Sequence, residues 1–184
     1  GILFDLGPHV IDQALVLFGA PEGVPARLFR QRRWSQVDDG FDVALEYPNF
    51  RALLRSRMLA YAPGPHYLIH GTKGSFVKYG MDPQEDPLRR GDVPDGPEWG
   101  ADWGEEPESQ WGTLTLPDDG KPRVERPRTQ KGDYRDFYAN IRDAILGISP
   151  LDVTPGQALR TMRAMELAVR SDKEKRTIAW PAEY

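Results

Sequence analysis

The sequence predicts an α+β fold, because helix-like segments near its two ends flank a long run of strand-like segments. Apolar residues recur with helical spacing near the N-terminus and twice near the C-terminus, and they alternate with polar residues in between. At 184 residues, the chain is long enough for one well-buried domain and short for two. We therefore expect residues 1–184 to form a single domain.

The first helix is predicted over about Pro8–Phe18. Pro8 suits a first helical turn, where its missing N–H removes no hydrogen bond. Gly19 and Pro21 form the stop signal. The apolar residues at helical spacing are Val10, Ile11, Ala14, Leu15, Leu17 and Phe18.

The strand-like segments follow this helix and read as an antiparallel meander. Apolar and polar residues alternate along them, as in strands with one buried face. Residues 71–74 have the composition of a hairpin turn. The predicted strands are 26–33, 41–47, 51–61, 66–70, 75–79, 112–116, 123–126 and 176–180.

Residues 81–132 form a long excursion rich in proline, glycine and acidic residues, with one short helix near 83–90. So long a loop in a compact domain usually has a role. Its Trp99, Trp103 and Trp111 could line a sugar site, because aromatic faces stack on the C–H surfaces of pyranoses. They could equally anchor the loop against the sheet or a partner subunit.

Two helices close the chain before the last strand. Asp133 is the expected N-cap of the first, which ends at Gly147. Residues Thr154-Pro155-Gly156-Gln157 match a capping box with proline at the first helical position. The second helix should run from there to about Ser171.

Composition narrows the possible partners. A net charge of −4 leaves no basic footprint for nucleic acid, and no apolar run approaches the ~20 residues that cross a bilayer. The absence of cysteine excludes disulfides and fits a cytoplasmic location. The apolar start at Gly1, with no methionine, suggests a cut through a larger protein.

The segment richest in candidate catalytic residues runs from Asp5 to Asp12. Asp5 precedes the helix by one turn, His9 lies at its start, and Asp12 follows three places on. A carboxylate beside an imidazole suits general acid–base catalysis. The alternative is that Asp5 caps the helix, His9 is a surface residue and Asp12 is structural. No ligand motif links His9 to His66 and His70, so we predict no metal site.

The segment from Asp5 to Asp12, together with residues farther along the chain, resembles the C-terminal domain of the Gfo/Idh/MocA (glucose–fructose oxidoreductase / inositol dehydrogenase) family. Residues 1–13 follow its Asp-x-Gly-x-His-x-x-Asp pattern. The resemblance continues, in order, through 69–80, 82–85, 132–134, 137–138, 144–145 and the helix from Thr154 to Ser171.

The resemblance implies a large, open, mostly antiparallel sheet with helices on one face and a homo-oligomer packed through the other. It also implies an N-terminal Rossmann domain that brings NAD or NADP and a lysine. This chain has no Gly-x-Gly-x-x-Gly, so that domain is absent from it. Alone, it should neither bind a cofactor nor be active.

The implied function is the substrate side of an NAD(P)-dependent oxidoreductase acting on a sugar or polyol hydroxyl. By position, His9 matches the catalytic acid–base and Asp5 the residue that orients it. Asp12, Lys78 and Tyr79 match candidate substrate contacts. The alternative is a non-catalytic oligomerisation or ligand-sensing module with the same fold.

Overall fold

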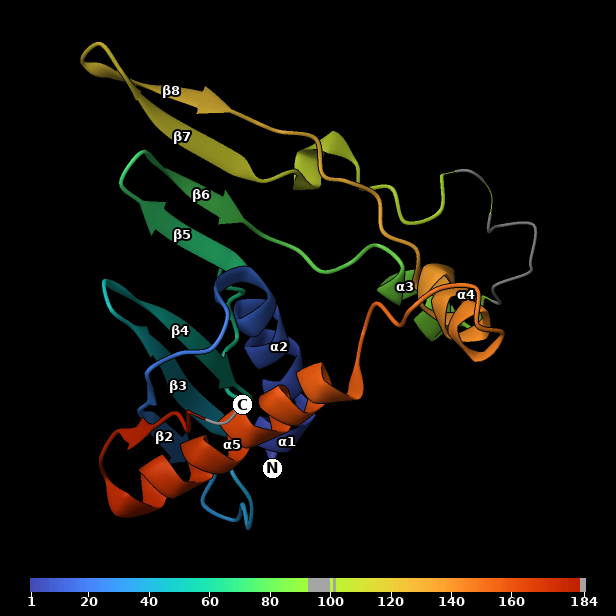
Figure 1. The fold of residues 1–184 in the computed structure, drawn as a ribbon. Coiled ribbons are helices and arrows are strands. Elements are labelled where there is room, and N and C mark those ends of the chain that lie inside the picture. The colour runs from blue at the N-terminus through green and yellow to red at the C-terminus, as the bar shows by residue number, and fades with distance from the viewer. Residues whose placement is uncertain (93–99, 101, 183–184) are drawn as a thin grey trace. The chain divides into compact units, whose positions relative to one another are not determined.

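A computed structural model describes residues 1–92, 100 and 102–182 of the chain (Figure 1). Its contacts group the chain into two compact units, each described below by itself. Unit 1 comprises Gly1–Tyr61 and Val153–Tyr184, and unit 2 comprises Ala62–Asp152. Both ends of the chain therefore belong to unit 1, and unit 2 is inserted between β4 and α5.

Unit 1 contains a five-stranded antiparallel sheet. Its longest strands are β3 (Gly40–Tyr47) and β4 (Phe50–Arg57), which pair along their whole length as a hairpin. The other edge of β3 pairs with β1 and β2, and β9 pairs with β1. These three short strands are Gly23–Val24, Ala26–Phe29 and Ile178–Ala179.

Three helices cover one face of this sheet: α1 (Ile2–Asp5), α2 (Gly7–Phe18) and α5 (Pro155–Glu174). Alternate residues of β3 point towards them, which accounts for the apolar alternation of its sequence. The core is therefore made where sheet and helices meet. Its buried residues include Leu3, Ala14, Phe41, Val43, Leu45, Leu167 and Ala168.

The opposite face of the same sheet carries ion pairs instead of an apolar surface. Asp42 pairs with Arg55 at 3.3 Å, and Glu46 pairs with Arg51 at 3.1 Å, each across the β3–β4 ladder. Leu53 is exposed between the two arginines. The arginines of both pairs are largely exposed, so this face is polar, in contrast to the apolar face that packs on the helices.

Unit 2 contains a four-stranded antiparallel sheet in the order β5-β6-β7-β8. Its strands are Tyr67–Gly71, Gly74–Lys78, Thr113–Asp118 and Lys121–Glu125. The excursion between β6 and β7 holds α3 (Glu85–Arg90) and the short 3₁₀ helix η1 (Glu108–Gln110). The last helix of the unit is α4 (Tyr134–Ile145).

The α+β class, with antiparallel open sheets and helices, is confirmed. The strand prediction for 26–33 was too long, because β2 ends at Phe29. The buried carboxylate of Asp39 accepts the backbone N–H groups of Gln31 (2.7 Å) and Arg32 (2.9 Å), which turns the chain away from the ladder. Arg30, Arg32 and Arg33 therefore lie in the loop that follows β2.

Candidate functional site

Asp5 and His9 lie four residues apart on a nearly continuous helical segment. Leu6 separates α1 from α2 but keeps a right-handed helical conformation (φ −95°, ψ −20°), and its N–H still donates to the carbonyl of Ile2. Helical phase is thus preserved, and residues at this spacing face the same side with Cβ atoms about 5–6 Å apart. Asp5 and His9 therefore lie on the same side of this segment, one turn apart.

Both side chains are exposed. Asp5 does not cap α2, whose N-cap is Leu6 without a side-chain hydrogen bond. Across the described residues, neither Asp5 nor His9 makes a side-chain hydrogen bond or ion pair. The capping alternative for Asp5 is therefore wrong, and both groups remain open to a ligand.

Gly7 explains how this segment packs so closely on α5. A Cβ at this buried position would lie 3.1 Å from Leu3 Cδ1 and 3.7 Å from the sulfur of Met165 on α5. The side chain of Leu3 would have to shift by a few tenths of an ångström to admit this Cβ, whereas the distance to Met165 is an ordinary van der Waals contact. The Asp-x-Gly-x-His spacing therefore has a packing reason as well as a chemical one.

Asp12 lies one turn after His9 and contacts α5. Its Oδ1 accepts a hydrogen bond of 3.0 Å from the hydroxyl of Thr161, which is 6% exposed. Asp12 itself is half-buried. Thr161 is a partner that the spacing of residues along α2 does not reveal, because it lies on α5.

Lys78 lies in unit 2 and is largely buried in an ion pair. Its ammonium donates to both carboxylate oxygens of Glu106 at 2.7 Å and to the carbonyl of Gln110 at 3.0 Å. These bonds use all three of its donors. The expected substrate contact of Lys78 stays a prediction, and it would require this ion pair to open.

Tyr79 follows β6 in unit 2 and is 55% exposed. Within the described ranges its side chain makes no hydrogen bond. Its expected role as a substrate contact also stays a prediction. The candidate residues thus fall into two groups, Asp5, His9 and Asp12 on α1–α2 in unit 1, and Lys78 and Tyr79 in unit 2.

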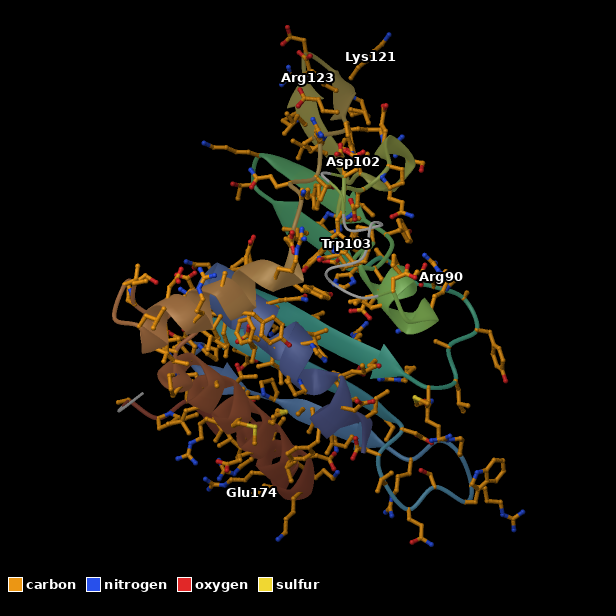
Figure 2. The ribbon with its side chains drawn as sticks, turned by 90° about the vertical axis from the view of Figure 1, so that its right-hand side faces the viewer. Arg90, Asp102, Trp103, Lys121, Arg123 and Glu174 are labelled. Carbon is orange, nitrogen blue, oxygen red and sulfur yellow. The ribbon has the colours of Figure 1, made fainter. Side chains whose placement is uncertain are left out.

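The excursion is held by a polar hub around Gln84. Gln84 is 1% exposed, and its Oε1 accepts the indole N–H of Trp103 (2.8 Å) and the backbone N–H of Tyr134 (2.9 Å). Trp103, labelled in Figure 2, is 7% exposed. Its ring anchors the loop and presents no stacking face to a sugar.

Of the other two tryptophans, the structure describes Trp111, which is half-buried. The indole N–H of Trp111 donates to the carbonyl of Glu106 at 3.2 Å, and Trp99 lies outside the described residues. The sequence does not predict the Gln84 hub, although Asp82-Pro83-Gln84-Glu85 forms part of the family resemblance. A glutamine beside a proline gives no sign of burial, since its partners lie 19 and 50 residues away.

A depression of 420 Å³ lies on unit 1 and is not near His9. It opens on the ion-paired face of the sheet, and five basic side chains and one carboxylate line it: Arg27, Arg51, Arg55, Lys175, Arg176 and Asp42. The candidate catalytic residues Asp5 and His9 therefore do not line this depression.

No cluster of three or more histidine and acidic side chains among the described residues could hold a metal ion. None of their helices is long and apolar enough to cross a membrane.

Comparison with known families decides the class. The model of an oxidoreductase family, for its C-terminal alpha/beta domain, matches residues 1–180. The chain belongs to the Gfo/Idh/MocA oxidoreductase family. It corresponds to the family's C-terminal domain. This match explains why the motifs from Asp5 to Ser171 follow one another in the family's order.

Curated relatives in this family include proteins of two bacteria. The chain is 40% identical to scyllo-inositol 2-dehydrogenase (NADP(+)) of Bacillus subtilis, over 97% of the chain and 49% of that protein. It is also 40% identical to an uncharacterized oxidoreductase of Escherichia coli, over 97% and 50%. The chain thus spans about half the length of these Gfo/Idh/MocA relatives.

Solved structures agree with this assignment. A Yersinia pestis protein superposes with a TM-score of 0.91 at 41% identity, covering 100% of the chain and 51% of that protein. An oxidoreductase of Bacillus cereus gives a TM-score of 0.87 at 28% identity, covering 100% and 61%. In the larger proteins this Gfo/Idh/MocA fold is again only part of the molecule.

Proposed function

We propose that this chain is the substrate side of an NAD(P)-dependent oxidoreductase that acts on a secondary hydroxyl of a sugar or polyol. The observation that carries the proposal is the exposed pair Asp5 and His9, four apart on one helical face and open to a ligand. The name of the Bacillus subtilis relative, which acts on an inositol, supports a cyclic polyol as the substrate.

In this proposal His9 takes the proton of the hydroxyl that is oxidised. An imidazole nitrogen accepts this proton, the carbon–oxygen bond becomes a carbonyl, and Asp5 orients the imidazole ring. Asp12, Lys78 and Tyr79 are the proposed contacts for the remaining hydroxyls. Removal of the proton completes the oxidation only if the hydride on the same carbon leaves in the other direction.

NAD or NADP supplies the hydride acceptor when bound. This chain has no Gly-x-Gly-x-x-Gly unit to cradle the pyrophosphate, so its own residues do not fit the cofactor. We propose that an N-terminal Rossmann domain holds it, as the half-length coverage of the relatives supports. The chain alone should then be inactive. We also propose that the full-length enzyme is cytoplasmic.

The direct test compares the chain alone with the full-length protein. Each is incubated with NAD or NADP and scyllo-inositol, myo-inositol or glucose, and the nicotinamide absorbance is followed. We expect turnover of at least one polyol by the full-length protein and none by the chain alone. Turnover by the chain alone would overturn the division of labour, and inactivity of the full-length protein would favour the ligand-sensing or oligomerisation module.

We also propose that the ion-paired face of unit 1 forms a homo-oligomer. Opposite charges arranged in rows can pair with a second copy across a two-fold axis, and exposed Leu53 lies among them. Sedimentation of Leu53→Asp should show dissociation relative to the wild type. Tyr61→Asp, at a 99% exposed position, is the matched control. A wild-type monomer would contradict this assembly.

A further inference from the structure

The contact between α2 and α5 includes one hydrogen bond whose position suggests a role in the chemistry. The hydroxyl of Thr161, on α5, donates to Asp12 Oδ1 at 3.0 Å. A threonine hydroxyl has one proton to donate, and its alternative acceptor, the carbonyl of Gln157 in the same helix, lies farther away at 3.4 Å. The charged acceptor is therefore the favoured one.

This hydrogen bond uses only one of the two carboxylate oxygens of Asp12. Over the ranges that the structure describes, no hydrogen bond reaches Asp12 Oδ2. The carboxylate is half-buried, so its rotation is restricted by packing and by Thr161 together. Asp12 is thus a fixed acceptor with one oxygen still available.

The available oxygen lies one helical turn from His9. Residues three apart on a helix face the same side, with Cβ atoms about 5–6 Å apart. A polyol held with one hydroxyl at His9 can therefore donate a second hydroxyl to Asp12. A carboxylate that is already oriented binds such a donor with less loss of side-chain entropy than a freely rotating one.

We propose that Thr161 is a positioning residue for substrate binding, which acts by holding Asp12 in the orientation that accepts a substrate hydroxyl. This role rests on the proposed function, since it requires His9 to mark the reacting carbon. Thr161 touches no substrate atom itself. Its effect should therefore appear in the KM for the polyol, and only weakly in kcat or in cofactor binding.

The variants that test this role are Thr161→Val, which keeps the shape and removes the donor, and Thr161→Ser, which keeps the donor. In the full-length enzyme we expect Thr161→Val to raise the KM for the preferred polyol about fivefold, as the loss of one hydrogen bond predicts. Its kcat should change less than twofold, and its Kd for the cofactor should be unchanged. Thr161→Ser should have a KM close to that of the wild type.

The coupling to Asp12 is measured by a double-mutant cycle. In an Asp12→Asn background, Thr161→Val should raise KM by less than twofold, because the oriented carboxylate is already lost. An equal fivefold rise in both backgrounds would overturn the role. So would a lower thermal midpoint of Thr161→Val with an unchanged KM, which would leave Thr161 as a tie between helices only.

The failure of this role is distinguishable from failure of the proposed function. If the wild-type enzyme oxidises a polyol and Thr161→Val has the wild-type KM, the proposed function stands and the role of Thr161 falls. If the wild-type enzyme oxidises no polyol, the proposed function falls and the role of Thr161 falls with it.

Discussion

At the scale of single residues, the carboxylate of Asp12 on α2 accepts a hydrogen bond from Thr161, a partner on the distant helix α5. The sequence predicts that His9 and Asp12 lie three residues apart on one helix, and α2 contains both, whereas Asp5 belongs to the short helix α1, which was not predicted. What spacing could not show is the partner of each side chain. Thr161 is 149 residues from Asp12, and only the packing of α2 on α5 brings them together.

Asp39 shows the same limit, and its burial leads to a prediction about pH. Hydrogen bonds from the backbone N–H groups of Gln31 and Arg32 lower the pKa of Asp39, against the opposing effect of burial. The stabilisation that follows is fully present above the unfolded pKa of about 4. It is lost as the pH falls through the lower folded pKa.

We therefore expect Asp39→Asn to reduce the free energy of unfolding at pH 7 and to have a smaller effect at pH 3. Urea denaturation at both pH values measures the difference. Asp86→Asn, at an exposed position on α3, is the control and should change little at either pH. An effect of Asp39→Asn that grows towards acid pH would contradict the assignment.

Lys78 gives a second prediction at this scale. Its side chain is 15% exposed and that of Glu106 is 5% exposed, so removing the lysine leaves a buried carboxylate without its cation. Lys78→Met should destabilise the protein by about 3 kcal/mol. The double variant Lys78→Met/Glu106→Met should recover part of this loss, whereas exposed Lys73→Met should have little effect.

Thermal and urea unfolding of these four proteins measure the ion pair. If Lys78→Met is as stable as the wild type, the pair is not structural, and the predicted substrate contact becomes the better explanation of this lysine. A rise in the KM for the polyol without any loss of stability would point the same way.

At the scale of elements, the ends of helices were predicted more closely than the ends of strands, because the residues that cap a helix lie next to it in the sequence. Thr154 and Gln157 form the reciprocal capping box that the sequence indicated, and Asp133 caps α4 through the N–H of Arg135. Short elements were missed. The single turn of α1 and the two residues of β1 are too brief to show a period.

The excursion depends on an element-scale contact that no local pattern predicts. Gln84 joins α3, the loop of Trp103 and the first turn of α4. Gln84→Leu would leave two N–H donors without their acceptor, at a cost of about 3 kcal/mol. Urea denaturation should show this loss, and exposed Gln130→Leu should not.

The fluorescence of Trp103 provides a second measurement on the Gln84→Leu variant. Loss of its hydrogen bond should alter the environment of the buried indole in the native state. If Gln84→Leu unfolds at the wild-type urea concentration with unchanged native fluorescence, the hub does not hold the excursion.

At the scale of the whole molecule, the prediction of one domain over residues 1–184 stays a prediction. Unit 2 is inserted into unit 1, and within the described part of its helices α3 and α4 no residue is buried. A unit with so small a core is marginal by itself. We therefore expect both units to unfold in one cooperative transition.

Fluorine-labelled tryptophans report on the two units separately, through Trp180 in unit 1 and Trp103 in unit 2. Leu45→Ala in the core of unit 1 should lower the urea midpoint of both signals equally, and Gln84→Leu in unit 2 should do the same. Midpoints that separate in either variant would show two independently folding parts.

The central claim for the whole molecule is that His9 is the acid–base group of a polyol oxidation completed by a cofactor-binding half. The most direct measurement is the turnover of His9→Ala in the full-length enzyme, together with its Kd for NADP. We predict a fall in kcat of about 10²–10⁴-fold, as for the loss of a general base, with cofactor affinity within twofold of the wild type. Turnover that survives in His9→Ala would contradict the claim.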